Sequence, residues 1–372
     1  MLEVTRFRFK WPRKIDSVHS RKWLLCAAAG MVLFLVVAVV LALWRIVTPL
    51  SAETLQNNLA RWSETHGHPA IVVGLIDNDR VSIFTIGSSG TRRPLDAESL
   101  FEIGSLTKTF TATILAEEIL ARRVHLNDPV QGYLPSSIRL PNYHGQPITM
   151  EDLATQTSGL PRLPTNMDTD APDPYAHYGA EQLTAFLNEY RLTRPPGSSY
   201  EYSNLGVGIL ALALSVHAHQ RYETLVSHAV LRPLNMHSTF VDVPRRLKGR
   251  LVVGHYENEG VAPVWHFRLF AGAGGLRSSL TDMLRYLAAN MSKQSLNGAC
   301  ELAQPPLRQI PGAKIGLIWM IWRNWMIWHN GETAGFHSFI GLTPDRRRGI
   351  VILAARGDAP LEMLGSKYLS PF

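Results

Sequence analysis

The residues of this chain best suited to covalent chemistry are a serine and a lysine three positions apart. Ser105 and Lys108 belong to a Ser-Leu-Thr-Lys segment, and no other serine in the sequence precedes a lysine by three residues. Side chains at positions i and i+3 of a helix lie on one face, so we expect the Lys108 amine beside the Ser105 hydroxyl. A desolvated lysine can stay uncharged near neutral pH and accept the hydroxyl proton, which makes the serine a nucleophile. The pattern therefore favours a serine hydrolase.

Such a nucleophile also needs a second proton carrier, donors for an oxyanion and groups that hold the substrate. Tyr202 and Asn204 lie in a Tyr-Ser-Asn segment at the predicted start of a helix, where a phenol can relay a proton and an amide can orient the lysine. His329 and Gly331 lie in a His-Asn-Gly segment on a predicted strand, with Glu332 next to them. Glycine in a strand lets a substrate backbone approach closely. Taken alone, each segment is also compatible with a purely structural role.

The elements expected to position these residues are strands at both ends of a domain with helices between them. The Ser105 segment should open a helix that runs to about residue 123, with an apolar stripe that buries it. Further helices are predicted at 52–66, 150–156, 181–190, 205–217, 222–231 and 279–291, the last capped by Ser279 or Thr281. Strands are predicted at 70–76, 81–86, 315–322, 325–328, 336–342 and 349–354. The order predicts an α+β fold, with one antiparallel sheet flanked by helices and a mostly helical region inserted at about 126–268.

The start of the chain carries a topology signal. Residues 23–44 form an uncharged apolar run of 22 residues, which at about 1.5 Å per residue spans roughly 33 Å, enough to cross a bilayer. Seven Lys or Arg and two acidic residues precede it, so +5 of the formal net charge of +7 lies in residues 1–22. We therefore predict a basic cytoplasmic segment (1–22), one N-terminal transmembrane helix (23–47) and an outer domain (51–372). The high pI reflects topology and indicates no nucleic-acid partner.

Composition and spacing argue against several other classes of protein. The two cysteines cannot plausibly pair, because Cys26 lies in the apolar run and Cys300 in the outer domain. The His-x-His pairs at 66–68 and 217–219 lack a nearby Asp or Cys, so we expect no metal site and no cofactor. The Gly-x-Ser-x-Gly pentapeptide of α/β-hydrolases does not occur. Nothing in the sequence indicates an oligomeric state.

Together the three segments resemble the class C β-lactamase and penicillin-binding serine hydrolase family. The resemblance covers about residues 52–355 and includes Phe-Glu-Ile-Gly before the Ser-Leu-Thr-Lys segment, residues 152–161 and residues 274–279. It implies the fold predicted above. It also implies that Ser105 is acylated, that Lys108 accepts its proton, and that Tyr202 relays protons and activates water for deacylation. Asn204 would bind the substrate amide and orient the lysine, and the backbone N–H groups of Ser105 and Glu332 would form the oxyanion hole.

One position departs from the pattern that the family implies. His329 stands where β-lactamases and DD-peptidases of this family usually carry a lysine, a fixed cation that holds the substrate carboxylate. Histidine is mostly neutral above about pH 6.5. We therefore expect carboxylate-dependent turnover to weaken as the pH rises through the His329 pKa. The chain after residue 355 is also short, so we expect the sheet to be less well covered there.

The resemblance implies a hydrolase of amide or ester bonds. Its substrate, a small molecule or a cell-wall peptide, stays open between a β-lactam, a D-Ala-D-Ala peptide, a D-amino-acid amide and a small ester, and is expected to be selected by loops 162–173 and 265–273. With the anchor, it implies a single-pass protein of the bacterial inner membrane with a periplasmic catalytic domain. The alternatives are a penicillin-binding sensor that is acylated without turnover, or a carboxylesterase of the same fold. The short cytoplasmic segment and Tyr202 argue against the sensor.

Overall fold

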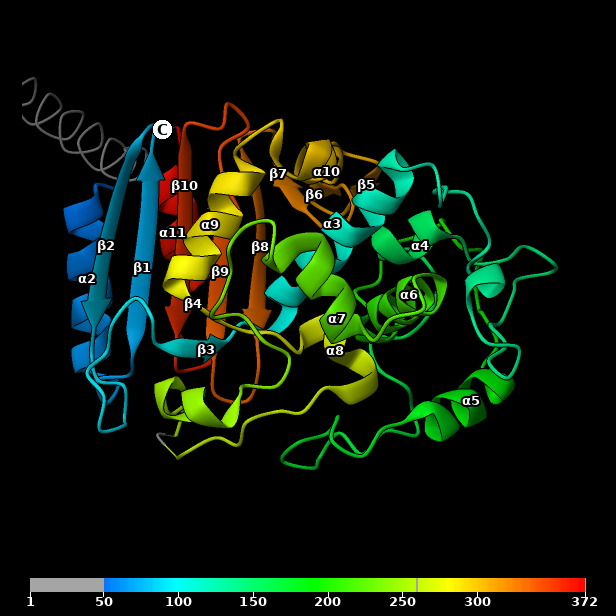
Figure 1. Cartoon of the computed structure of the whole chain (residues 1–372), viewed down its shortest axis with the longest axis horizontal. Coiled ribbons are helices and arrows are strands. Elements are labelled where there is room, and N and C mark those ends of the chain that lie inside the picture. Colours follow the sequence, from blue (N-terminus) through cyan, green and yellow to red (C-terminus); the bar gives the residue numbers. More distant parts are fainter. Residues whose placement is uncertain (1–49, 259, 372) are drawn as a thin grey trace, which may run out of the picture. The chain divides into compact units, whose positions relative to one another are not determined.

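The computed structural model describes residues 50–258 and 260–371, whose centre is an eight-stranded antiparallel sheet of order β2-β1-β10-β9-β8-β7-β6-β5 (Figure 1). Its strands are β1 (Ile71–Asp77), β2 (Arg80–Ile86), β5 (Arg308–Ile310), β6 (Ala313–Ile315), β7 (Met320–Trp322), β8 (Met326–Glu332), β9 (His337–Leu342) and β10 (Arg348–Ala354). A two-stranded sheet joins β3 (Leu100–Glu102) to β4 (Arg277–Ser279). Because β1 pairs with β10, strands from both ends of the domain complete one sheet, which confirms the predicted α+β fold.

Helices pack on both faces of this sheet and fill the region between β3 and β5 (Figure 1). They are α2 (Ala52–Glu64), α3 (Thr107–Leu120), α4 (Met150–Ala154), α5 (Ala180–Glu189), α6 (Asn204–His217), α7 (Tyr222–Val226), α8 (Ala271–Gly274), α9 (Leu280–Asn290), α10 (Ala299–Leu302) and α11 (Leu361–Leu369). Short helical turns lie at Gly104–Leu106 (η1), Val130–Tyr133, Ser227–Leu231, Arg245–Arg250, Arg268–Phe270 and Ser295–Gly298. The predicted helices are confirmed, and Ser279 is the cap of α9, since its hydroxyl accepts the Asp282 N–H.

Strand β1 shows why the sheet has two apolar layers. All of its residues except the last are buried, and successive side chains point to opposite faces. Ile71 and Val73 pack with α2 and α11, whereas Val72 belongs to the large cluster on the other face. A Cβ at Gly74 would lie 2.7 Å from a Leu284 methyl carbon, so α9 sits directly on the strand at that point.

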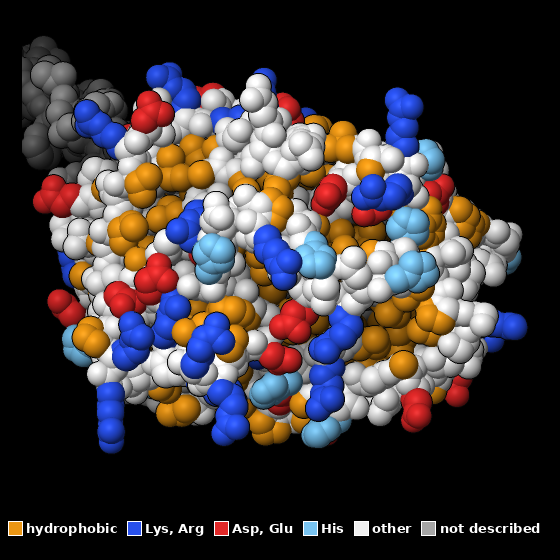
Figure 2. All heavy atoms as spheres, viewed as in Figure 1, with side chains coloured by type: hydrophobic (Ala, Val, Ile, Leu, Met, Phe, Trp, Pro, Cys, Tyr) orange, Lys and Arg blue, Asp and Glu red, His pale blue; other side chains and the backbone are white. Residues whose placement is uncertain are grey.

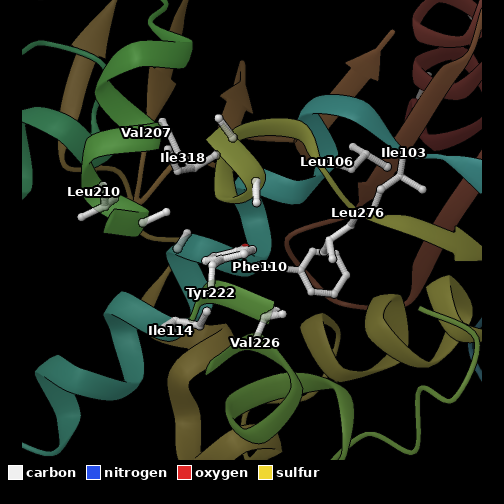
Figure 3. Packing of buried hydrophobic residues seen from close by; sticks show 14 of the residues in the cluster. Ile103, Leu106, Phe110, Ile114, Val207, Leu210, Tyr222, Val226, Leu276 and Ile318 are labelled. Carbon is white, nitrogen blue, oxygen red and sulfur yellow. The ribbon is translucent and has the colours of Figure 1, made fainter. Parts of the chain in front are cut away.

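Helix α3 lies inside this larger cluster rather than on its surface. Side chains from α3, α6 and α7 converge around Phe110, which stacks on Tyr286 with ring centroids 3.9 Å apart (Figure 3). The predicted apolar stripe is confirmed, but burial extends around the whole first three turns and includes Lys108, whose side chain has no exposed surface. The surrounding apolar contacts therefore hold the amine in a region that excludes water.

Two predictions about the last third of the chain are wrong. The predicted strand 315–322 is two strands, β6 and β7, separated by a turn in which the Gly316 N–H donates to the Trp319 carbonyl. A Cβ at Gly316 would lie 2.7 Å from the Ala303 carbonyl oxygen, so glycine is required where the chain turns back. The sheet is also well covered after residue 355. Helix α11 packs on β9 and β10 through apolar residues with helical spacing, namely Leu361, Leu364, Tyr368 and Leu369.

The predicted cytoplasmic segment and transmembrane helix (1–47) lie outside the described residues and stay predictions, as does the proposed division into domains. Among the helices of residues 50–258 and 260–371, none combines the length and the apolar character that crossing a bilayer requires. Figure 2 shows Lys and Arg side chains interspersed with Asp and Glu over the drawn face, in line with the near balance of charges after residue 22.

Candidate active site

Ser105 lies in the helical turn η1, directly before α3, and is held there by a close backbone approach to β8. Gly104 has a φ of +48°, and a Cβ at this position would lie 2.6 Å from the Glu332 backbone nitrogen. Only glycine tolerates both the left-handed conformation and this contact. The structure thus places the backbone of Glu332 beside the residue that precedes the serine. This is where the predicted oxyanion hole requires the two backbone N–H groups to meet.

Lys108 is fixed by three contacts, all of them to oxygen atoms. Its Nζ lies 2.9 Å from Ser105 Oγ, 2.7 Å from Asn204 Oδ1 and 2.5 Å from the Ala273 carbonyl oxygen. The amide and carbonyl oxygens can only accept hydrogen bonds. An uncharged amine has two N–H bonds and one lone pair, so donating both N–H groups to these acceptors leaves the lone pair facing the serine hydroxyl. Burial, aided by the positive charge of Arg162, lowers the pKa of Lys108 well below its usual value.

Tyr202 approaches the serine from the segment before α6. Its hydroxyl donates to Ser105 Oγ over 2.6 Å, and Lys108 Nζ lies 5.0 Å from the centroid of its ring. Burial raises the Tyr202 pKa above its ordinary value. The phenol is therefore protonated at neutral pH, and the three groups form a directional chain in which Tyr202 donates to Ser105 and Ser105 can donate to Lys108.

Asn204 is the first residue of α6, and both ends of its amide are engaged. Its Oδ1 accepts from Lys108, and its Nδ2 donates to the Tyr175 hydroxyl over 2.9 Å. The structure thus confirms that Asn204 contacts the lysine, whereas its N–H group meets Tyr175 rather than open solvent. Since the Tyr175 oxygen accepts this bond, its own proton is left to donate elsewhere in the cavity. The sequence offered no signal for Tyr175, which lies in a loop.

His329 lies on β8, as predicted, but it does not reach the substrate cavity. Its side chain is buried, and Nδ1 donates to the Asn330 carbonyl oxygen over 2.6 Å. Burial lowers the His329 pKa well below its ordinary value, and a positive charge on Lys108, when that amine is protonated, lowers it further. The imidazole is thus neutral across the physiological range, and the expectation that its charge controls carboxylate binding near pH 6.5 is wrong. The neighbouring Gly331 is packed so tightly that a Cβ would lie 2.1 Å from the Ile103 carbonyl oxygen.

Ser105, Tyr202, Asn204 and Glu332 line one cleft of about 480 Å³. Both loops expected to select the substrate contribute to it, which confirms their placement. Arg162, Leu163, Thr169, Ala171, Trp265 and Phe267 belong to these two loops, and Asn330 and Thr333 lie within and just after the His-Asn-Gly segment. The lining residues that the sequence reasoning missed are Pro174 and Tyr175. Three of the aromatic rings form one wall, since Tyr175 stacks on Phe267 at 4.3 Å and Trp265 packs against both.

The two loops are tied together at the rim of this cleft. The Trp265 indole donates to the Pro172 carbonyl, and the backbone N–H of His266 donates to the Asp173 carboxylate. On the inner side, the buried Glu102 accepts from the Trp265 N–H and forms an ion pair with Arg277 at 3.0 Å. The walls of the cleft are therefore anchored to β3 and β4, which directly precede η1 and α9 in the chain.

Comparisons with known proteins agree with this architecture. The beta-lactamase family model matches residues 52–365. The chain is 29% identical over 286 residues to the D-alanyl-D-alanine-carboxypeptidase/endopeptidase AmpH of Escherichia coli (strain K12), covering 70% of this chain and 71% of that protein. It is 25% identical over 346 residues to a beta-lactamase of the same strain, covering 80% and 89%.

Solved structures share the fold. A class C beta-lactamase superposes with a TM-score of 0.76 at 22% identity, covering 86% of this chain and 96% of that one. A beta-lactamase/D-alanine carboxypeptidase from Pseudomonas syringae superposes with a TM-score of 0.75 at 20% identity, covering 86% and 98%. At this level of identity the superpositions show a common architecture.

Proposed function

The chain belongs to the beta-lactamase family, and on that premise we propose that it hydrolyses amide or ester bonds through an acyl-enzyme at Ser105. The observation that carries the proposal is the arrangement around Lys108, whose Nζ contacts Asn204 Oδ1, the Ala273 carbonyl oxygen and Ser105 Oγ. A neutral amine donates to the first two oxygens and keeps its lone pair for the serine hydroxyl. A buried amine with a lowered pKa is suited to act as the general base.

In the acylation step, Ser105 Oγ attacks the substrate carbonyl carbon while its proton passes to Lys108 Nζ. The resulting oxyanion is stabilised by the backbone N–H groups of Ser105 and Glu332. When the bond to the leaving nitrogen or oxygen breaks, Tyr202 gives that atom its phenolic proton. The proton held on Lys108 then restores the phenol, so the acyl-enzyme forms with the amine neutral again.

Deacylation reverses these roles with water as the nucleophile. A water molecule attacks the ester carbonyl, and its proton reaches Lys108 through Tyr202. Because the Tyr202 pKa is raised, the phenol cannot hold a negative charge in the resting enzyme and serves as a relay between water and amine. Collapse of the second tetrahedral intermediate returns the proton to Ser105 Oγ and releases the carboxylic acid.

The experiment that tests this function compares the full chain with Ser105→Ala on nitrocefin, a D-Ala-D-Ala peptide and p-nitrophenyl acetate. We expect multiple turnovers on at least one of the three and none above background for the variant. One equivalent of product followed by no further release would indicate the alternative, a penicillin-binding protein that is acylated without turnover. The contact between Tyr202 and Ser105 favours turnover, since it provides a proton relay for deacylation.

We further propose that residues 23–47 anchor the protein in the bacterial inner membrane, with the catalytic domain in the periplasm. The proposal rests on the length of the apolar run and on the basic residues before it. Protease treatment of spheroplasts tests it: cleavage of the catalytic domain while an intact membrane shields a tag before residue 1 is expected. Recovery of the whole chain in the soluble fraction would contradict it.

A further inference from the structure

The cleft has no cation on β8 at the position where the family resemblance implies a lysine that holds the substrate carboxylate. His329 occupies that position, but it is buried, neutral and absent from the lining of the cleft. Two β8 residues do line it, and neither is a cation: Glu332 is acidic, and Asn330 donates from Nδ2 to Glu362 Oε1 over 2.6 Å. Any carboxylate that binds here must therefore find its positive partner on another wall.

Arg162 is the single Lys or Arg among the residues that line this cleft, and Glu332 is the single acidic one. The Arg162 side chain is exposed, and within residues 50–258 and 260–371 its guanidinium makes no hydrogen bond or ion pair. Its backbone is nevertheless fixed, because its carbonyl oxygen accepts the N–H groups of Asn204 and Leu205 at the start of α6. The residue thus combines an anchored backbone with an available positive charge.

The Arg162 guanidinium lies next to the Tyr202 ring. Its central carbon is 5.1 Å from the centroid of the Tyr202 ring, and the hydroxyl of that ring contacts Ser105 Oγ. Tyr202 is the group proposed to protonate the leaving atom. A carboxylate a few bonds beyond that atom, as in an amino acid or a carboxyphenol, therefore comes within reach of Arg162. Arginine suits this task because its planar fork binds a carboxylate through two parallel hydrogen bonds.

We propose that Arg162 is the residue that recognises a carboxylate on the leaving group of the substrate, and that it makes the enzyme selective for such substrates. The inference rests on the proposed function, since it concerns the same cleft and the same acyl transfer. It places the anion-binding group on the loop between α4 and α5 instead of on the strand β8.

The positive charge of Arg162 also affects the protonation of Lys108, the proposed general base. The groups facing Lys108 are Ser105, Asn204 and the Ala273 carbonyl, with Tyr202 beside them and His329 behind. After desolvation, the charge of Arg162 is the second cause of the lowered Lys108 pKa. Loss of this charge should therefore move the acidic limb of kcat/KM toward higher pH for every substrate, whether or not it carries a carboxylate.

Two aryl esters with the same acylglycyl group test the proposal. Their leaving groups are 3-hydroxybenzoate and 3-hydroxybenzamide, which have nearly the same shape but carry a charged carboxylate and a neutral carboxamide, respectively. Release of the phenol gives kcat/KM at pH 7 for the full chain and for Arg162→Gln, Arg162→Lys and Arg245→Gln. Arg245 is an exposed arginine away from the cleft and serves as the matched control. Any change in Lys108 affects both esters alike, so the ratio of the two kcat/KM values isolates carboxylate recognition.

We expect the wild-type chain to prefer the carboxylate ester, and Arg162→Gln to reduce this preference by about 10- to 100-fold, as loss of a charged hydrogen-bonded pair does. Arg162→Lys should restore part of the preference, and Arg245→Gln should leave it unchanged. Equal rates for the two esters in the wild type, or an unchanged preference in Arg162→Gln, would overturn the assignment while leaving the hydrolase intact. Failure to cleave either ester, with no adduct on Ser105, would overturn the proposed function and the assignment together.

Discussion

The substitution Asn204→Asp tests most sharply whether Lys108 is a neutral amine. It adds a negative charge beside Lys108 while the side chain at position 204 keeps its shape. Asn204 Oδ1 lies 2.7 Å from Lys108 Nζ. A carboxylate at this distance stabilises the ammonium form by about 6 kcal/mol at an effective dielectric constant of 20. The cost of burying that carboxylate offsets much of this gain. If a third of this stabilisation remains, which is about 2 kcal/mol, protonation of Lys108 becomes about 30-fold more favourable.

A raised Lys108 pKa leaves less of the neutral amine at pH 7, so kcat/KM falls there and recovers as the pH rises. The midpoint of the acidic limb should move up by about 1.5 on the pH scale. The assay is the pH profile of kcat/KM for an uncharged ester, with circular dichroism to verify folding.

Tyr175→Phe is the control for this experiment. It removes the partner of the Asn204 N–H group without adding a charge, so its profile should keep the wild-type midpoint. A uniform loss of activity in Asn204→Asp at every pH, with an unmoved midpoint, would refute the reasoning that Lys108 must be neutral.

Three further predictions concern the supports of the site. Gly104→Ala should lower the rate of Ser105 acylation at least tenfold and reduce Tm. The control is Gly312→Ala, which should reduce Tm alone, because Gly312 also has a positive φ (+73°) but no atom lies near its Cβ position. Tyr202→Phe should lower kcat/KM about 100-fold or more, measured with the same ester. Burial lowers the His337 pKa, but the hydrogen bond and the charge of Glu362 outweigh it, so the pKa is raised above its ordinary value. Glu362→Gln should therefore reduce Tm more at pH 6 than at pH 9.

The stability that the ion pair between His337 and Glu362 contributes depends on pH. Because the pKa of His337 is higher in the folded protein, its ion pair with Glu362 stabilises the fold fully below about pH 6.5. That contribution declines as the pH rises through the folded-state pKa of the imidazole. An equal loss of Tm at the two pH values would show that the ion pair does not form.

The catalytic cluster could be predicted because its chemistry is carried by side chains in short segments. Ser105 and Lys108 are one helical turn apart, and the Tyr-Ser-Asn segment places Tyr202 and Asn204 at a capped helix start. Each of these segments folds locally into the shape that its spacing indicates. Long-range packing then brings them together, and the order of elements was enough to predict the sheet on which they rest.

What escaped prediction depends on contacts that residue type does not reveal. The Ala273 carbonyl that completes the Lys108 site is a backbone atom, and any residue could supply it. Tyr175 lies in the loop between α4 and α5 and is placed by stacking on Phe267, from a loop about 90 residues further along the chain. The burial of His329 follows from the position of β8 inside the sheet, between β7 and β9, with η1 packed on the strand, which no local pattern encodes.

The prediction that the sheet is poorly covered after residue 355 was a different kind of error, because the sequence pattern of helix α11 was present. Leu361, Leu364, Tyr368 and Leu369 have the spacing of a helix with one apolar face. The turn between β6 and β7 was likewise marked by Gly316, within a run that otherwise reads as one continuous apolar strand.

The most direct test of the account is the mass of the full chain after incubation with benzylpenicillin or the uncharged aryl ester, followed by peptide mapping. We predict one acyl group per chain, located on the peptide that contains Ser105 and absent from Ser105→Ala. A chain that hydrolyses the reagent yet never carries an adduct under rapid acid quenching, or one that carries it on another residue, would contradict the covalent mechanism.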